Sequence, residues 1–303
     1  MARRRLSSVL GVAGSVALVA VGLALATTTP DISYDRGSPP HKASLNALDV
    51  HVPDTPSRAP RPVVVMVHGG AWSHGSKESF EQNKARALTD AGYVVVNINY
   101  RLSPHGLFAT WRPGRIRHPD HVHDVAEAVG WVHDEIARFG GDPDRIALLG
   151  HSAGAHLVSL VGTDPSHLDG AAVPRSALRA VVSLDSAAYQ VRGRIESSRG
   201  AMRRMYTTAF GRPREERRDP SWRAASPLTH ADPSDPPELV VTQTRNADRR
   251  AEATRFATAL GQRAGDVLAL GYSHAAISRR LGSANDPEGL TTAVLAFLAR
   301  ELG

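Results

Sequence analysis

The sequence predicts an α/β protein with a mostly parallel, doubly wound sheet and helices on both of its faces. Two observations support this class. Apolar runs of strand length, such as 62–67 and, interrupted by Asn97 alone, 93–98, are typical of strands buried on both faces. These runs alternate along the chain with longer segments of helical spacing, as repeated strand–helix units do. The 303 residues, 42% of them hydrophobic, suffice for one large domain with a packed core.

Residues 1–26 have the pattern of an export signal. Arg3, Arg4 and Arg5 form a basic start, the following residues to 26 carry no charge, and Ala24-Leu25-Ala26 is typical of a signal-peptidase site. The uncharged segment is also long enough to span a bilayer, so a retained membrane anchor is the alternative. In either case the basic start predicts that the rest of the chain lies outside the cytoplasm, secreted or tethered.

The remainder divides into a linker and one folded domain. Residues 27–43 are rich in Thr, Pro and Ser and are predicted to form a linker without folded content. The folded domain is predicted to occupy 44–303. Its expected strands are 45–52, 62–67, 93–98, 145–149, 178–184, 238–242 and 267–270, and its expected helices are 77–91, 122–139, 155–160, 249–263 and 290–302. The alternation lapses at about 187–235, which predicts a small, partly helical cap; the alternative is a connecting loop without function.

Charge and cysteine content exclude several classes of function. The net charge of +6 includes the three arginines of the N-terminal segment. The arginine-dense stretch 192–218 is interleaved with Glu196, Glu215 and Glu216, which is typical of a solvated face, so no nucleic-acid partner is expected. The chain has no cysteine, which excludes a thiol nucleophile, a cysteine-based zinc site and a disulfide framework.

The stretch Gly150-His151-Ser152-Ala153-Gly154 predicts a nucleophile elbow. It follows an apolar run of strand length and precedes a helix-like segment. A Gly-x-Ser-x-Gly sequence between strand and helix forms a tight, strained turn that exposes the serine Oγ, with the glycines removing Cβ clashes. The alternative is an ordinary loop that contains a serine. We interpret Ser152 as a nucleophile.

A serine nucleophile needs a histidine base and a carboxylate that orients the histidine. In an open α/β sheet these follow later strands in the order Ser, acid, His. Asp248 follows the predicted strand 238–242, and His274 follows the last predicted strand. Asp185, which ends the strand 178–184, is the alternative acid. We favour Asp248 because it is the last acidic residue near a strand end before His274.

An acyl-transfer site also needs hydrogen-bond donors for the oxyanion. The sequence His68-Gly69-Gly70-Ala71-Trp72 directly follows a predicted strand and supplies bare backbone there. We expect the N–H groups of Gly70, Ala71 and Ala153 to form this oxyanion hole.

The remaining histidines suggest structural roles. His68, His151 and His156 lie in or near the two loops of the predicted site and are expected to shape the backbone. The loosely spaced set His118, His121 and His123 lacks a partnering Cys or Glu-x-x-His, so no metal is expected. No cofactor is expected either.

Six motifs together resemble the HGG-motif branch of the α/β-hydrolase superfamily, from about Leu45 to Gly282. This branch includes carboxylesterases of the hormone-sensitive-lipase type and kynurenine formamidase-like enzymes. The motifs are His68–Trp72, Asn99–Pro104, Phe139–Arg145, Gly150–Leu157, Ser226–Leu228 and Gly271–His274. The resemblance implies the α/β-hydrolase fold, with Ser152 as nucleophile, Asp248 as acid and His274 as base.

Two features depart from the family pattern. Ala71 replaces the third glycine of the usual oxyanion motif, and Thr242-Gln243-Thr244-Arg245 replaces the small, glycine-containing turn expected before the acid.

The expected function is an exported serine hydrolase that cleaves small-molecule carboxylic esters through an acyl-enzyme intermediate. An amidase or arylformamidase of the same fold is one alternative. A non-catalytic binding protein on a hydrolase scaffold is another, and its mark would be a broken triad, whereas here all three positions are filled.

Overall fold

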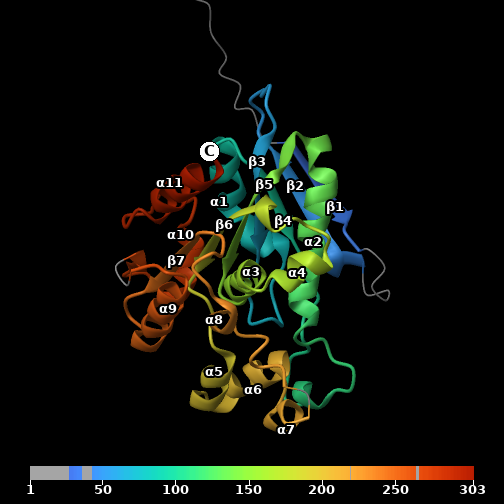
Figure 1. Ribbon diagram of the computed structural model, residues 1–303, viewed down its shortest axis with the longest axis vertical. Coiled ribbons are helices and arrows are strands. Elements are labelled where there is room, and N and C mark those ends of the chain that lie inside the picture. The colour runs from blue at the N-terminus through green and yellow to red at the C-terminus, as the bar shows by residue number, and fades with distance from the viewer. Residues whose placement is uncertain (1–26, 36–42, 219, 264–265) are drawn as a thin grey trace, which may run out of the picture.

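The computed structural model describes residues 27–35, 43–218, 220–263 and 266–303. An eight-stranded sheet forms its centre, with the order β1-β2-β4-β3-β5-β6-β7-β8 (Figure 1). The strands are β1 Thr27–Ser33, β2 Ala47–Val52, β3 Arg61–Val67, β4 Val94–Ile98, β5 Gly141–His151, β6 Leu178–Leu184, β7 Glu238–Gln243 and β8 Leu268–Leu270. β2 runs antiparallel to both neighbours and all other pairs are parallel, so the predicted fold class is confirmed.

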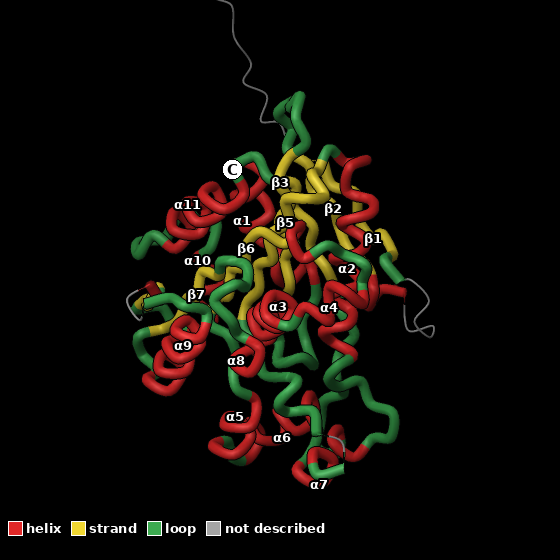
Figure 2. Tube along the Cα trace, in the orientation of Figure 1, coloured by secondary structure: helices red, strands yellow, loops and turns green. Residues whose placement is uncertain are grey.

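Helices cover both faces of this sheet (Figure 2). They are α1 Lys77–Asp90, α2 Asp120–Glu135, α3 Ala153–Thr163, α4 Pro165–Gly170, α5 Val191–Ser197, α6 Gly200–Phe210, α7 Pro213–Glu216, α8 Pro227–His230, α9 Ala247–Ala259, α10 His274–Arg280 and α11 Leu290–Leu302. Side chains of α1, α10 and α11 share one hydrophobic core, and those of α2 and α3 share the core on the opposite face. None of the helices in these described ranges is long and apolar enough to cross a membrane.

The apolar run of β3 shows why the central strands lack a polar face. Val63 and Val65 point into the core under α2 and α3, whereas Val64 and Met66 point into the core under α1 and α11. Successive side chains of a strand alternate between its two faces, so a strand covered on both sides must be apolar throughout. The resulting rigid sheet carries its functional loops at the carboxyl ends of β3, β5 and β6.

Thr27–Ser33 corrects one prediction, because this part of the expected linker is an edge strand. Thr27 pairs with Val52, and the register shifts between Thr29 and Ile32. This irregularity accommodates Pro30, which has no N–H to donate to the ladder. Residues 36–42 of the expected linker and the expected signal segment 1–26 lie outside the described residues.

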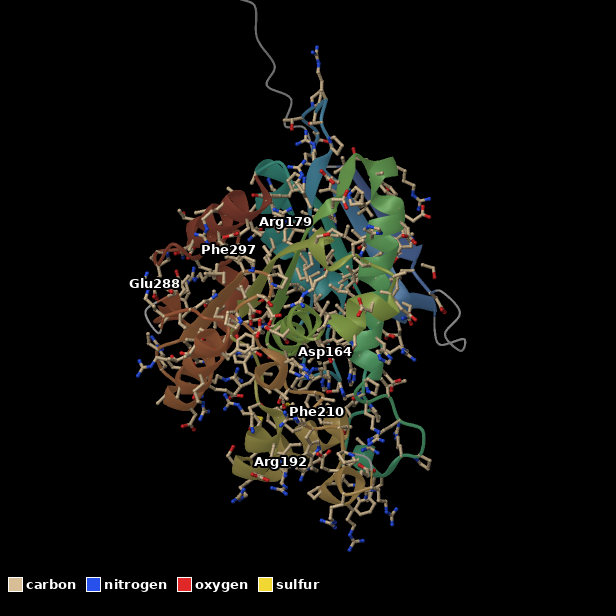
Figure 3. The ribbon with its side chains drawn as sticks, viewed as in Figure 1. Asp164, Arg179, Arg192, Phe210, Glu288 and Phe297 are labelled. Carbon is tan, nitrogen blue, oxygen red and sulfur yellow. The ribbon has the colours of Figure 1, made fainter. Side chains whose placement is uncertain are left out.

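The segment between β6 and β7, where the sequence predicts a cap, contains the four short helices α5 to α8. Helices α5, α6 and α7 lie together at the lower end of the molecule in Figure 1. Phe210, the last residue of α6, lies on the side of the cap that faces α3 (Figure 3). Its ring packs edge-on against Trp72 at 4.7 Å between centroids, and Tyr206 of the same helix lies 5.8 Å from Trp72. The cap is thus packed against the loop that follows β3.

Glu238, the first residue of β7, is a buried carboxyl that packs against α3. Ser159 Oγ lies 2.8 Å from the carbonyl oxygen of Ala155 and 2.6 Å from Glu238 Oε1. A hydroxyl has one proton and cannot donate to both acceptors. A protonated Glu238 that donates to Ser159 satisfies both contacts, and burial raises the pKa of Glu238 to about 8.

Glu238 predicts a pH dependence of stability. Its pKa is about 8 when folded and near its ordinary value of 4.5 when unfolded, so between these values unfolding releases a proton and stability falls as the pH rises. Glu238→Gln retains the shape and removes the titration. We therefore expect the difference in melting temperature, variant minus wild type, to be greater at pH 9 than at pH 5 by about 2 °C or more.

Thermal unfolding followed by circular dichroism at both pH values measures this gain. Glu196→Gln, which changes an exposed carboxylate on α5, is the control and should leave the difference unchanged. If the melting temperatures of Glu238→Gln and the wild type changed equally between the two pH values, Glu238 would be ionised in the folded protein.

Candidate active site

Ser152 occupies a strained turn between β5 and α3. Its φ of 57° and ψ of −112° lie in a region that residues with a side chain rarely adopt. The glycines on either side are required by close backbone approach. A Cβ on Gly150 would lie 2.4 Å from the carbonyl carbon of Gly154, and one on Gly154 would lie 2.1 Å from the oxygen of Val67. The chain therefore has the geometry of a nucleophile elbow.

His274 lies in hydrogen-bond contact with this serine. It is the first residue of α10, a helix capped by the side chain of Ser273. His274 Nε2 lies 2.9 Å from Ser152 Oγ, and Nδ1 lies 2.5 Å from Asp185 Oδ2. An ionised carboxylate only accepts hydrogen bonds, so Nδ1 carries the proton and Nε2 presents its lone pair to the serine hydroxyl. This is the tautomer that removes a proton from Ser152.

Asp185 takes the position that the sequence analysis gave to Asp248, and that prediction is corrected. Asp185 directly follows β6 and is 1% exposed. Asp248 lies in the first turn of α9, exposed to solvent, where a carboxylate interacts favourably with the positive end of the helix. The chain after β7 turns into α9 through Asn246, whose side chain accepts from the N–H of Arg249. Asp248 is therefore part of a helix start.

The end of β7 instead holds Asp185 in place. Gln243 Nε2 donates to Asp185 Oδ2 at 2.8 Å, and Thr242 Oγ1 donates to Oδ1 at 3.3 Å. Arg249 donates to the carbonyl oxygens of Asp185 and Ser186 at 3.1 and 2.8 Å. Burial alone would raise the pKa of the Asp185 carboxyl, but the hydrogen bonds from His274 and Gln243 and the charge of Arg249 lower it below its ordinary value. Asp185 is thus held ionised.

These supporting residues were not predicted, although the sequence contains a signal for them. The polar turn Thr242–Arg245 departs from the family pattern at the place where the acid was expected. In the structure this departure supplies donors for a carboxylate on the neighbouring strand. Two polar residues end the buried strand β7, and Asp185 directly follows the neighbouring strand β6. This pattern could have identified the acid.

The loop after β3 lies against the elbow and presents free amide groups. A Cβ on Gly69 would lie 2.9 Å from the backbone oxygen of His151 and 3.2 Å from the Cβ of Ser152, so glycine lets the two loops approach this closely. Gly70, Ala71 and Trp72 all have positive φ, at 111°, 55° and 57°, which forms a tight turn.

The amide N–H groups predicted for the oxyanion hole have no other partner in this part of the structure. Within the described residues, the N–H groups of Gly70, Ala71 and Ala153 donate to no acceptor. That of Ala153 is free because it belongs to the first turn of α3, where the helix offers no acceptor. Ser103 N donates to the carbonyl oxygen of Trp72 at 2.7 Å and fixes the far end of the turn. Free donors beside Ser152 are what an oxyanion requires.

Two buried histidines support the loops without carrying charge. His151 Nε2 lies 2.9 Å from the carbonyl oxygen of His274, and burial together with the nearby His274 lowers the pKa of His151 to about 3. Neutral His151 therefore donates to the backbone at the start of α10. His68 stacks on Tyr100 at 4.3 Å between ring centroids, and burial lowers its pKa to about 4.

The other histidines have separate contacts. His156 Nε2 lies 2.8 Å from the carbonyl oxygen of Ala225 and connects α3 to the cap segment. His121 Nε2 lies 2.9 Å from Ser103 Oγ, His118 packs near Phe210, and His123 lies against the ring of another histidine. Within the described ranges, no three side chains converge as metal ligands.

A largely apolar cavity of about 500 Å³ lies beside the free amides. Ala71 forms part of its wall, together with Ser103 and the segment that follows it. The opposite wall is α6 of the cap, with Met202 and Met205. A group bound at the oxyanion turn would therefore have an apolar space next to it.

The chain resembles known esterases in sequence. The BD-FAE family model matches residues 48–253. The probable carboxylic ester hydrolase LipM of Mycobacterium tuberculosis is 39% identical over 137 residues, which are 45% of this chain and 28% of LipM. Esterase LipQ of the same organism is 38% identical over 136 residues, 45% of this chain and 29% of LipQ. The match thus spans less than a third of the length of these curated relatives.

Solved structures share the fold over nearly the whole chain. A truncated carbohydrate esterase from gut microbiota has a TM-score of 0.68 at 18% identity, covering 91% of this chain and 96% of that one. The thermostable carboxylesterase EstE1, from a metagenomic library, has a TM-score of 0.65 at 25% identity, covering 92% and 90%. The α/β-hydrolase fold implied by the sequence motifs is confirmed. Since the family model matches more than half of its residues, the chain belongs to the BD-FAE family of α/β-hydrolases.

Proposed function

We propose that the chain is an exported serine hydrolase that cleaves carboxylic esters. One observation carries the catalytic part. His274 bridges Ser152 and the buried Asp185, next to a turn whose N–H groups have no acceptor among the described residues. This arrangement supplies a nucleophile, a base in the correct tautomer and an oxyanion site, which are the requirements of acyl transfer. The filled triad also argues against a non-catalytic binding role.

The mechanism follows from these contacts. Ser152 Oγ attacks the acyl carbon while His274 Nε2 takes its proton, and the negative charge on the carbonyl oxygen is stabilised by the N–H groups of Gly70, Ala71 and Ala153. Collapse of the intermediate breaks the ester C–O bond, and His274 returns the proton to the leaving alkoxide. Water then attacks the acyl-enzyme by the same route and releases the acid. Asp185 remains ionised and stabilises the imidazolium in each half-reaction.

Two observations support an ester of modest size as the substrate. The cavity beside Ala71 has room for an apolar group of limited length, lined by the two methionines of α6. The relatives LipM and LipQ are named as ester hydrolases, and the structural neighbour EstE1 is named a carboxylesterase. A panel of p-nitrophenyl esters of increasing chain length, compared with N-formylkynurenine, tests this choice against an amidase or formamidase.

We expect Ser152→Ala to abolish turnover of the p-nitrophenyl esters and labelling by a fluorophosphonate probe. Removal of the nucleophile typically lowers the rate by several orders of magnitude. Ser73→Ala, which alters a serine of the neighbouring loop that does not contact His274, is the control and should still be labelled. Labelling of Ser152→Ala at the wild-type rate would assign the nucleophile to another residue.

We expect Asp185→Asn to lower kcat by roughly 10³–10⁴-fold, because an amide donor opposite Nδ1 favours the wrong tautomer of His274. Asp248→Asn is the matched control and should change kcat by less than about threefold, since its side chain is exposed at a helix start. Steady-state kinetics of both variants, at equal thermal stability, decide between the two carboxylates. A larger loss in Asp248→Asn would restore the order-based assignment.

The export proposal concerns the N-terminal segment, and it includes cleavage between Ala26 and Thr27. Signal peptidases accept only small side chains at this site, so we expect Ala26→Leu to retain the protein on membranes while the wild type is released. Cell fractionation and N-terminal sequencing measure both outcomes. A wild-type protein that sediments with membranes and begins at Met1 or Ala2 would instead be an anchored enzyme.

A further inference from the structure

The large apolar side chains that are exposed in the described residues gather on one face. They are Leu107, Phe108, Trp111 and Met202, each between 50% and 72% exposed. Leu107 and Met202 line the same cavity, and Trp111 lines a second hollow together with residues of α6. Scattered exposed apolar residues are ordinary, but a contiguous group marks an interaction surface.

The second hollow adds positive charge to this face. It measures about 490 Å³, and the described residues of its wall include Trp111 and no carboxylate. Five arginines line it: Arg203, Arg204, Arg212, Arg214 and Arg217. Arg212 is held over the Trp111 ring at 3.9 Å and bound by Glu215. Arg204, Arg214 and Arg217 are exposed and form no ion pair with a described residue. These three cations are available to a partner.

We propose that this face, comprising the four apolar residues together with Arg204, Arg214 and Arg217, docks the protein on an anionic lipid surface. Apolar side chains ringed by arginines match the two layers of such a surface, with acyl chains below and anionic headgroups around them. Each arginine near an anionic membrane strengthens binding about fivefold at low salt, so three contribute on the order of a hundredfold. The structure favours this partner over a second copy of the chain, because a two-fold contact through the same face would bring the arginines of both copies together.

The position of the face gives docking a consequence for the site. The cap helices α6 and α7 lie at the lower end of the molecule in Figure 1, and Arg192 of the neighbouring α5 lies at the same end in Figure 3. The cavity that Leu107 and Met202 line is bounded on its inner side by Ala71 of the oxyanion turn. A docked protein would therefore open this cavity toward the lipid, and an apolar ester could enter without crossing water.

Tryptophan fluorescence tests the proposal on the full chain. The other tryptophans, Trp72, Trp131 and Trp222, are at most 7% exposed, so only Trp111 can approach lipid. We expect vesicles of brominated phosphatidylcholine containing phosphatidylglycerol to quench part of the fluorescence, and we expect Trp111→Phe to lose that component. This readout is local to Trp111, so binding of vesicles by another part of the chain does not produce it.

The charge requirement is tested by a triple variant and its matched control. Arg204→Gln/Arg214→Gln/Arg217→Gln should raise the lipid concentration for half-maximal quenching by tenfold or more, as should omission of phosphatidylglycerol. The control Arg58→Gln/Arg179→Gln/Arg250→Gln removes the same charge from exposed positions elsewhere. It should change the lipid concentration for half-maximal quenching by less than about twofold.

Three results would overturn the proposal. The first is an absence of quenching by the vesicles. The second is an equal effect of the two triple variants on the lipid concentration for half-maximal quenching. The third is a dimer that forms without lipid and that Leu107→Ser/Phe108→Ser dissociates. The last result would identify a second copy of the chain as the partner. Quenching is measured without an ester substrate, so its outcome is independent of the proposed catalytic mechanism.

Discussion

The contact between His274 and Asp185 joins parts of the chain that are far apart in sequence, and the geometry of the site depends on it. Asp185 follows β6, His274 begins α10 after β8, and Ser152 follows β5. The ends of three strands must therefore place these side chains within hydrogen-bond distance of one another. The parallel sheet makes this possible because its strands end at a common edge. The contact also fixes the tautomer of His274, on which the reactivity of Ser152 depends.

Keeping that carboxylate charged in a buried position requires compensation. An ionised carboxylate without partners is costly inside a protein, and its pKa would rise until it took up a proton. Asp185 avoids this through donors from two directions, His274 on one side and the end of β7 on the other. Arg249 adds a positive charge whose guanidinium also binds the local backbone, so it restrains the turn and the charge together. The residues of β7 thus act on the site through Asp185.

The sequence predicted the parts of the site that local geometry determines. The pairing of Ser152 with His274 could be predicted because the glycines of the elbow and the position after the last strand each constrain one short segment. The acid could not, because Asp185 and Asp248 both lie near strand ends and the choice depends on how the chain leaves β7. The N-capped helix α9 starts there, and Asp248 in its first turn is exposed to solvent, whereas Gln243 at the end of β7 donates a hydrogen bond to Asp185.

In the fold, too, the elements set by a local sequence pattern were predicted and those set by tertiary contacts were not. Continuous apolar runs identified the central strands, since burial on both faces leaves a clear pattern. The edge strand β1 was predicted as linker, because its Thr, Pro and Asp residues are equally typical of loops. What orders it is tertiary: Asp49 accepts from the N–H of Asp31, and Lys77 forms ion pairs with both carboxylates. Such contacts join residues distant in sequence and leave no local periodicity.

The oxyanion turn is held by parts of the chain on which substrate specificity also depends. Trp72, the last residue of the turn, packs against Phe210 of the cap, and its carbonyl oxygen accepts from Ser103 of the segment that forms one wall of the cavity. A movement of either element would shift the backbone that presents the free N–H groups. Because an oxyanion site loses most of its effect when its donors move away from the developing charge, the cap and the 103–112 segment influence the rate as well as the choice of substrate. The same two elements carry the exposed apolar residues and the exposed arginines Arg204, Arg214 and Arg217, so a partner bound to that face would contact the supports of the oxyanion turn directly.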